Sequence, residues 1–285
     1  MGLWLLPTDI CLVTGGKTGL GAELINLFAN YGCQTVSLDL YSLTEDNSIV
    51  VPECVNSLST EHRTGNVATL HLNCDVCDEQ SILEAKELIY KRFHRYPSVI
   101  ILNAAIRGAI SSVNNTSTKS LQRIIDVNLG GVIRCAKIFM PEMISMNRGY
   151  IVTIASALGM VIPKGFSAYG AAKAGVIGFH EGLSFELADH KKVRTLLVCP
   201  GQLDTELFSD VHTPNKFVAP VVSKSKLAEV IFKRIRKGKT HTIYSPLYVR
   251  YLPWMKVMST PLMRTARKIS NIDKVYDEAV ATTEP

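Results

Sequence analysis

Short apolar, β-branched runs alternate with helical patterns along most of this chain of 285 residues. A continuous apolar run of this length predicts a strand buried on both faces, and alternation with helices predicts a parallel sheet. We therefore expect an α/β fold, a doubly wound parallel sheet of about seven strands with helices on both faces. The expected strands are 9–14, 34–39, 67–73, 98–102, 149–155, 193–199 and 240–244, and the expected helices are 19–31, 78–93, 118–146, 168–190 and 224–237.

A glycine-rich segment, Thr14-Gly-Gly-Lys-Thr-Gly-Leu-Gly21, follows the first expected strand and opens the first expected helix. Glycines at such a turn let the backbone approach a pyrophosphate and let the helix pack closely on the sheet. The helix N-terminus adds free N–H groups and the positive end of a dipole. This context predicts a Rossmann-type dinucleotide site with cofactor contacts from Thr14, Gly15, Lys17, Gly19, Leu20 and Gly21.

Asp39 ends the second expected strand, eighteen residues after Gly21. A carboxylate there accepts hydrogen bonds from the adenosine ribose hydroxyls and repels a 2′-phosphate, which favours NAD. Lys17 leaves NADP open, because a basic residue in the loop can pair with that phosphate. The ends of the third and fourth strands complete the expected cofactor set: Asp75 on the adenine amino group, Val76 against the ring, and Asn103 and Ala104 beneath the cofactor.

Tyr169 and Lys173 lie four residues apart on an expected helix, and Tyr169 follows Ser156 by thirteen residues. On a helix this spacing puts the phenol and the ammonium on one face. An isolated tyrosine ionises near pH ~10, whereas a fixed ammonium neighbour stabilises the phenolate and brings its pKa towards neutrality. The pair therefore predicts a general acid/base.

Taken together, these segments resemble the short-chain dehydrogenase/reductase superfamily. The resemblance runs in order through Thr14–Gly21, Asn103-Ala-Ala105, Asn128, Ser156, Tyr169 with Lys173, and Pro200-Gly-Gln-Leu-Asp-Thr205. One departure is Leu102-Asn-Ala-Ala105, where the family usually has Asn-Asn-Ala-Gly, and it removes one side-chain hydrogen bond near the cofactor.

The resemblance also implies roles for these residues. Tyr169 is then the general acid/base, Ser156 hydrogen-bonds the substrate oxygen, and Lys173 lowers the pKa of the tyrosine and binds the nicotinamide ribose. Asn128 holds a water in a proton relay. Further implied cofactor contacts come from Tyr169, Lys173, Pro200, Gly201, Leu203 and Thr205.

Apolar side chains follow both Ser156 and Pro200-Gly201, which favours a lipophilic alcohol or ketone as substrate. They are Leu158, Met160, Val161, Ile162, Leu203, Leu207, Phe208, Val211, Phe217 and Val218. The expected activity is NAD(P)-dependent hydride transfer involving a retinoid, steroid or lipid-like alcohol or ketone. Two alternatives stay open: an NADPH-dependent reductase of a lipid-biosynthetic ketone, and a non-catalytic dinucleotide-binding scaffold.

Positive charge is concentrated near the C-terminus, since residues 221–285 hold 13 of the 31 Lys and Arg but only 5 of the 25 Asp and Glu. Such an imbalance predicts an anionic partner, and with no nucleic-acid recognition motif we expect a membrane surface. For the helical stretch from Lys224 to Lys239 the alternative is an ordinary solvated helix. Residues 243–263 place Trp, Tyr and cations beside apolar residues, as at a lipid headgroup boundary, while three prolines argue against a spanning helix. The alternative is a lid or dimer contact packed on the protein.

The expected organisation is a dinucleotide-binding and catalytic domain over residues 1–245, followed by a basic, aromatic-rich tail over 246–285. The tail is similar to that of membrane-associated retinol and hydroxysteroid dehydrogenases, which implies a peripheral position on the cytoplasmic side of the endoplasmic reticulum or a lipid droplet. The family resemblance also implies a homodimer or homotetramer.

Residues 42–66 are polar and weakly periodic, which predicts a loop with one short helix. The seven cysteines have no framework spacing, so buried thiols in a reducing compartment are expected. Cys74-Asp-Val-Cys77 lacks a second pair or a histidine companion, and no metal site is expected.

Overall fold

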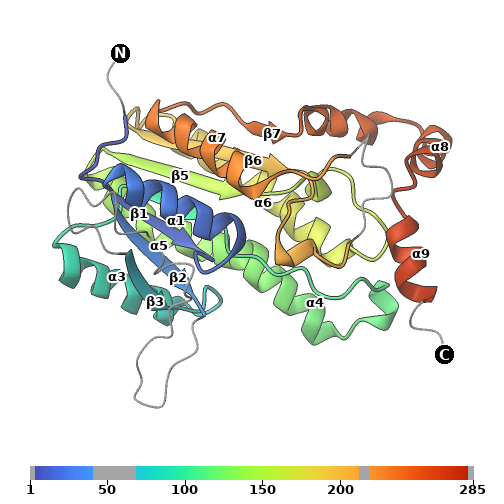
Figure 1. Cartoon of the computed structure of the whole chain (residues 1–285), viewed down its shortest axis with the longest axis horizontal. Coiled ribbons are helices and arrows are strands. Elements are labelled where there is room, and N and C mark those ends of the chain that lie inside the picture. The colour runs from blue at the N-terminus through green and yellow to red at the C-terminus, as the bar shows by residue number, and fades with distance from the viewer. Residues whose placement is uncertain (1–3, 41–68, 212–218, 282–285) are drawn as a thin grey trace.

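The computed structural model describes residues 4–40, 69–211 and 219–281. Its strands form one sheet in the order β3-β2-β1-β4-β5-β6-β7 (Figure 1), and every neighbouring pair is parallel. The strands are β1 Ile10–Thr14, β2 Gln34–Asp39, β3 Thr69–Asn73, β4 Val99–Leu102, β5 Gly149–Ile154, β6 Val193–Pro200 and β7 Ile243–Ser245. The expected α/β fold class is confirmed, and the winding direction reverses between β1 and β4.

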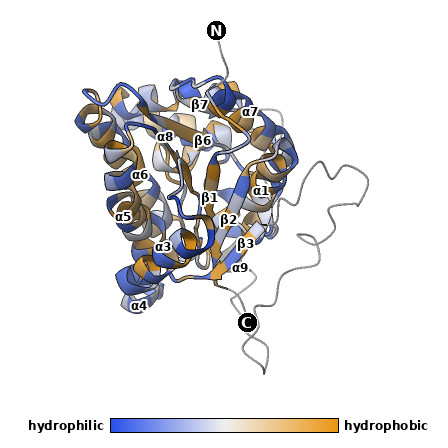
Figure 2. Cartoon of the chain, turned by 90° about the vertical axis from the view of Figure 1, so that its left-hand side faces the viewer, coloured by the Kyte–Doolittle hydropathy of each residue, from blue (hydrophilic) through white to orange (hydrophobic). Residues whose placement is uncertain are grey.

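Helices cover both faces of the sheet. On one face α1 (Gly19–Tyr31) packs against α7 (Lys224–Arg236), and on the other lie α3 (Glu79–Phe93), α5 (Gly131–Ser145) and α6 (Ser167–Glu186). In Figure 2 the strands at the centre of the molecule are coloured mostly as hydrophobic, while the helices carry both colours. Two apolar cores, one on each side of the sheet, follow from this arrangement.

The expected helix over 118–146 is interrupted. It consists of α4 (Thr118–Ile125), a π-helical turn Asp126–Gly130, and α5. Asn128 lies in that turn with its side chain fully buried, where Nδ2 donates to the carbonyl oxygen of Ile106 at 2.6 Å and Oδ1 accepts from the Ile106 N–H at 2.9 Å. The π-helical turn between α4 and α5 is thus hydrogen-bonded to the loop that follows β4.

Some expected boundaries shift. The last strand begins at Ile243 rather than Thr240, because pairing with β6 begins only where Ile243 lies opposite Val198. Residues 67 and 68 of the third expected strand, the expected loop over 42–66, and the expected lining residues Phe217 and Val218 lie outside the described residues. Of the cysteines described, Cys11, Cys33, Cys74, Cys135 and Cys199 are buried and unpaired.

Residues 246–281, here called the C-terminal segment, continue beyond the sheet as a 3-10 helical stretch Leu247–Val257, then α8 (Thr260–Ser270) and α9 (Lys274–Ala281). Arg267 is ion-paired with Asp273 and donates to the carbonyl oxygen of Ile162 at 3.1 Å. The Lys164 N–H donates to Asp273 Oδ1 at 2.9 Å. The segment is therefore fastened to the loop that follows Ser156. None of the helices within the described ranges is long and apolar enough to cross a bilayer.

Candidate active site

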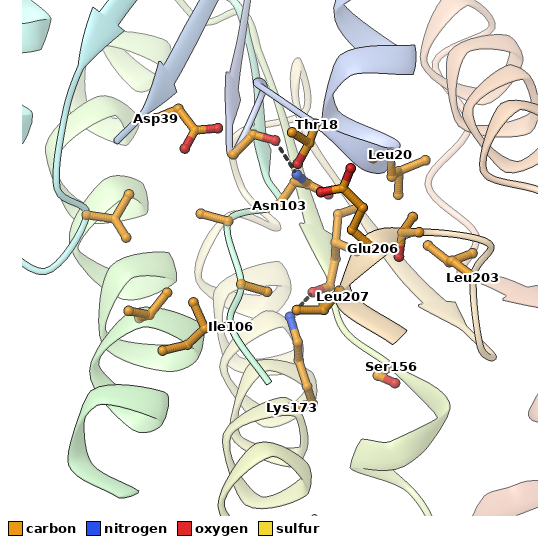
Figure 3. Close-up of a pocket in the computed structure, with 18 of the residues that line it drawn as sticks. Thr18, Leu20, Asp39, Asn103, Ile106, Ser156, Lys173, Leu203, Glu206 and Leu207 are labelled. Carbon is orange, nitrogen blue, oxygen red and sulfur yellow. Dashed lines mark hydrogen bonds between the residues drawn. The ribbon is translucent and has the colours of Figure 1, made fainter. Parts of the chain in front are cut away.

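A cavity of about 500 Å³ lies beyond the carboxyl ends of β1, β2, β4, β5 and β6. In Figure 3 Asp39 lies towards one end of it, and Ser156 and Lys173 lie towards the other. It is lined by most of the residues that the sequence singles out: Gly15, Gly19, Leu20, Asp39, Asp75, Val76, Asn103, Ala104, Ser156, Tyr169, Lys173, Pro200, Gly201, Leu203 and Thr205. This edge of a doubly wound sheet is where such folds bind their ligands.

The glycine loop is shaped for a close backbone approach. Gly15 and Gly19 have positive φ angles of 66° and 58°, which glycine adopts without a steric penalty. A Cβ on Gly21 would lie 2.0 Å from the carbonyl oxygen of Gly15, so only glycine fits there. Thr18 begins α1 without a side-chain cap hydrogen bond, and the first turn of the helix has no acidic residue. The first N–H groups of α1 are therefore suited to an anionic ligand.

Thr14 and Asn103 support this loop from below. Thr14 Oγ1 accepts hydrogen bonds from the N–H groups of Asn103 at 2.9 Å and Ala104 at 3.0 Å. Asn103 Nδ2 donates to the carbonyl oxygens of Thr14 at 3.0 Å and Gly15 at 2.9 Å. These four hydrogen bonds join the ends of β1 and β4 and fix the floor of the cavity.

Asp39 and Asp75 present carboxylates at the cavity wall. Asp39 Oδ2 accepts from the Lys17 N–H at 2.9 Å, and Oδ1 accepts from the Leu40 N–H at 2.8 Å. Asp75 Oδ2 is ion-paired with Arg123 at 3.1 Å. Burial alone would raise the pKa of Asp75, but hydrogen bonds from the Cys77 N–H and from Arg123 lower it. Each carboxylate oxygen has room for a second hydrogen bond, so ribose or adenine donors can still bind.

Four of the expected site residues do not line this cavity: Thr14, Lys17, Gly21 and Asn128. Thr14, Gly21 and Asn128 shape the site from behind, through the contacts described above. Other lining residues were not among the expected site residues: Thr18, Leu38, Leu40, Cys74, Ala105, Ile106, Arg123, Val127, Ile154, Ala155 and Glu206. Arg123 lies on α4, far along the chain from Asp75, and no local pattern signals that pair.

Ser156, Tyr169 and Lys173 meet at the other end of the cavity. All three are buried, with 6%, 4% and 2% of their surface exposed. Lys173 Nζ donates to the carbonyl oxygen of Ile154 at 2.9 Å and lies 5.9 Å from the centroid of the Tyr169 ring. Ser156 Oγ accepts from the Leu158 N–H at 3.1 Å, and the serine lies near enough to Tyr169 to lower its pKa. The spacing along α6 thus brings the phenol and the ammonium together, as the sequence predicts.

The direction of the tyrosine pKa differs from the expectation. Burial raises the pKa of Tyr169 to about 12, while the hydrogen bond with Ser156 and the charge of Arg107 oppose that rise. Burial also lowers the pKa of Lys173 to about 8, with Cys199 opposing the change. Desolvation is therefore the main cause of both pKa shifts.

A second, mostly apolar cavity of about 250 Å³ adjoins the first and shares Ser156, Gly201 and Phe208 with it. Of the expected substrate-lining residues, Leu158, Val161, Phe208 and Val211 line this cavity, and Leu203 and Leu207 line the first. Met160 and Ile162 line neither. The C-terminal segment supplies another part of the wall: Tyr248, Leu252, Met255, Ser270, Ile272 and Val275.

Known proteins resemble the chain in sequence. A family model for short chain dehydrogenases matches residues 9–216. An uncharacterized oxidoreductase of Saccharomyces cerevisiae is 30% identical over 280 residues, which cover 96% of this chain and 85% of that protein. Retinol dehydrogenase 10 of Xenopus tropicalis is 32% identical over 231 residues, which cover 72% of this chain and 67% of that protein.

Solved structures share the fold. Levodione reductase superposes with a TM-score of 0.70 at 20% identity, covering 83% of this chain and 95% of that one. A 3-ketoacyl-(acyl-carrier-protein) reductase from Brucella melitensis, complexed with NADH, superposes with a TM-score of 0.68 at 18% identity, covering 84% and 98%. The solved structures show only a shared fold, whereas the match to the family model and the identity to the yeast protein show family membership. The chain belongs to the short-chain dehydrogenase family of oxidoreductases.

Proposed function

We propose that this oxidoreductase transfers hydride between NAD and a lipophilic alcohol or ketone, with Tyr169 as the acid/base. One observation carries the proposal: Ser156 lines both the cavity of the glycine loop and the apolar cavity, and Tyr169 lines the first and packs on Phe208, which lines both. A substrate carbon seated there can face a nicotinamide on one side while its oxygen faces the serine and the tyrosine. The glycine loop, the free N–H groups of α1 and the carboxylate of Asp39 suit a dinucleotide in the larger cavity.

In the oxidative direction each residue has one task. The nicotinamide, when bound, accepts the hydride that leaves the carbinol carbon. Tyr169 Oη, as phenolate, takes the hydroxyl proton, and Ser156 Oγ donates a hydrogen bond to the substrate oxygen. Lys173 holds the nicotinamide ribose. Ketone reduction reverses these steps, with Tyr169 returning the proton. Asn128 has its amide engaged on both sides by Ile106, so its place in a water relay stays a prediction.

Asp39 supports NAD as the cofactor, because its carboxylate lies at the end of β2 where a 2′-phosphate would be repelled. Titration of NADH and NADPH, followed by fluorescence, tests this preference. We expect NADH to bind at least tenfold more tightly, roughly the effect of one unfavourable charge contact. Tighter binding of NADPH would instead favour the alternative of an NADPH-dependent reductase, with Lys17 on the phosphate.

The apolar cavity supports a lipophilic substrate, and the retinol dehydrogenases among the relatives put retinoids first in a screen. The panel is all-trans-retinol, testosterone and 2-dodecanol, each with NAD, followed by NADH formation. We expect turnover of at least one of them. NADH binding without turnover of any would favour the non-catalytic scaffold.

Tyr169→Phe tests the acid/base assignment. We expect kcat to fall by at least about 100-fold, the usual contribution of a positioned proton-transfer group, while the Kd for NADH stays near the wild-type value. Tyr90→Phe, on the exposed surface of α3, is the matched control and should keep full activity. A Tyr169→Phe protein with near-normal kcat would show that another group moves the proton.

We also propose that the C-terminal segment closes the substrate side of a domain formed by residues 1–245 and rests on an anionic lipid surface. Its inward side chains line the apolar cavity, whereas Trp254, Val257 and Ile269 are 70%, 78% and 77% exposed. Exposed cations accompany them: Arg250, Lys256, Arg264 and Lys268. Apolar side chains among cations are typical of interfacial segments. This would place the protein peripherally on the cytoplasmic face of the endoplasmic reticulum or a lipid droplet.

Flotation with phosphatidylcholine vesicles, with and without phosphatidylserine, tests the membrane contact. We expect flotation that depends on phosphatidylserine and is lost in Trp254→Glu/Val257→Glu. Phe185→Glu, which replaces an equally exposed apolar side chain on α6, is the matched control and should float like the wild type. Light scattering during gel filtration tests the proposed homodimer or homotetramer. A monomer that never floats would remove both partner assignments.

A further inference from the structure

Arg107 lies just beyond the end of β4, beside the proposed catalytic group and outside every residue set that the sequence singled out. Its guanidinium carbon is 5.9 Å from the ring centroids of both Phe166 and Phe208. Phe208 in turn packs edge-on against Tyr169, with 5.8 Å between ring centroids. The cation is thus held between two rings of the apolar cavity, one of which touches the reacting tyrosine.

The guanidinium of Arg107 is only partly neutralised. Its Nη2 is paired with Asp210 Oδ2 at 2.7 Å, but the Arg107 side chain is 11% exposed whereas that of Asp210 is 60% exposed. Nη1 is buried and has no hydrogen-bond partner within the described part of the chain. An ion pair with one partner in solvent is weakly coupled, so much of the arginine charge is left to act on its buried neighbours.

The groups that face Tyr169 are few. Within the described residues, Ser156 lies near enough to lower its pKa and Lys173 lies on its own helix, while Glu206 and Tyr248 line the adjoining cavities. Burial lowers the pKa of Lys173, whereas the charge of Arg107 opposes the rise in the pKa of Tyr169. Arg107 is therefore a second cation of this cluster, joined to Tyr169 through the Phe208 ring, and it stays charged at every working pH.

We propose that Arg107 is a positioning residue for the reaction: its fixed charge stabilises the Tyr169 phenolate, and its pair with Asp210 keeps Phe208 over the apolar cavity. The inference rests on the proposed function of Tyr169 as acid/base. Three variants separate the effect of the Arg107 charge from the effect of its ion pair with Asp210. Arg107→Gln removes the charge and the pair, Arg107→Lys keeps the charge, and Asp210→Asn keeps the cation but removes its carboxylate partner.

The test is the pH profile of kcat for alcohol oxidation with NAD, using the panel alcohol that the wild-type protein oxidises fastest. With a phenolate as the base, kcat rises with pH, and the midpoint reports the tyrosine in the complex. In Arg107→Gln we expect the midpoint to move up by roughly one pH unit, because removing a nearby positive charge disfavours the phenolate. Arg107→Lys should stay close to the wild-type midpoint.

Asp210→Asn should leave the midpoint in place or move it down, and raise KM by up to about fivefold, the effect of losing one exposed ion pair. Thermal melts check that each variant is folded. A folded Arg107→Gln protein with the wild-type midpoint, or an Asp210→Asn midpoint that moves up equally, would overturn the role of the charge. Turnover by Tyr169→Phe, in contrast, would overturn the proposed function itself.

Discussion

A methyl group on Gly21 is the sharpest test of the cofactor cavity. In Gly21→Ala the new Cβ would lie 2.0 Å from the carbonyl oxygen of Gly15 and 2.8 Å from Asn103 Nδ2. Carbon atoms do not approach backbone oxygen that closely, so the first turn of α1 and the glycine loop must move apart by about 1 Å. Neither contact is with the end of a flexible chain, because Asn103 is itself held by two carbonyl groups.

The size of the effect follows from the hydrogen bonds that the displaced loop gives up. A hydrogen bond from a backbone N–H to a charged phosphate contributes about 1.5–3 kcal/mol. Losing one of them therefore raises the Kd for NADH roughly 10- to 100-fold. Overpacking at Gly21 also costs about 1–3 kcal/mol of stability, so Tm should fall by several degrees.

Fluorescence titration with NADH and a thermal melt measure both effects. The matched control is Gly178→Ala on the exposed face of α6, where a Cβ would meet no atom within 4 Å. Because alanine is the better helix former, this variant should gain about 0.5–1 kcal/mol and bind NADH normally. A Gly21→Ala protein whose Kd lies within about twofold of the wild type would refute the assignment of the pyrophosphate to this loop.

Burial lowers the pKa of His180 from 6.5 to about 4. Between these two pH values the histidine is protonated in the unfolded chain but not in the folded protein. The free energy of unfolding therefore falls as the pH drops from 6.5 to about 4. Between pH ~7 and pH ~5, the Tm of His180→Gln should fall less than the Tm of the wild type. An equal fall in both proteins would show that His180 does not cause the loss of stability in acid. Burial of the charged Lys173 destabilises the fold below its pKa of about 8, so Lys173→Met should raise Tm more at pH ~7 than at pH ~10. Arg267→Ala, which loosens the C-terminal segment, should raise KM for 2-dodecanol and leave the Kd for NADH unchanged in titrations.

The fold, and the gathering of most expected site residues around one cavity, were predictable because their signals are local. A short apolar run marks each strand, and the glycine loop, Asp39 and the Tyr169–Lys173 spacing each occupy a few consecutive residues. The π-helical turn at Asn128 was not predictable in this way. It depends on hydrogen bonds to Ile106, a contact between segments 22 residues apart.

The pKa shifts and ion pairs of the site could not be predicted from the sequence either. Spacing shows that an ammonium lies near Tyr169, but it gives no measure of desolvation, which here decides the direction of both pKa shifts. The pair Arg107–Asp210 joins residues 103 positions apart, and Arg123–Asp75 joins residues 48 apart. Both pairs exist only because the carboxyl ends of the strands meet at one edge of the sheet.

The C-terminal segment lines the apolar cavity, yet its described residues add no strand to the sheet and line no part of the larger cavity. If the apolar cavity takes the substrate, as proposed, mutations in this segment would change what the enzyme accepts and leave the wall of the larger cavity intact. Family members could then differ in substrate range through substitutions in the C-terminal segment, or through its replacement, while the rest of the fold stays the same. A chimera that carries the corresponding stretch of another family member should inherit the donor's preference and keep this protein's coenzyme.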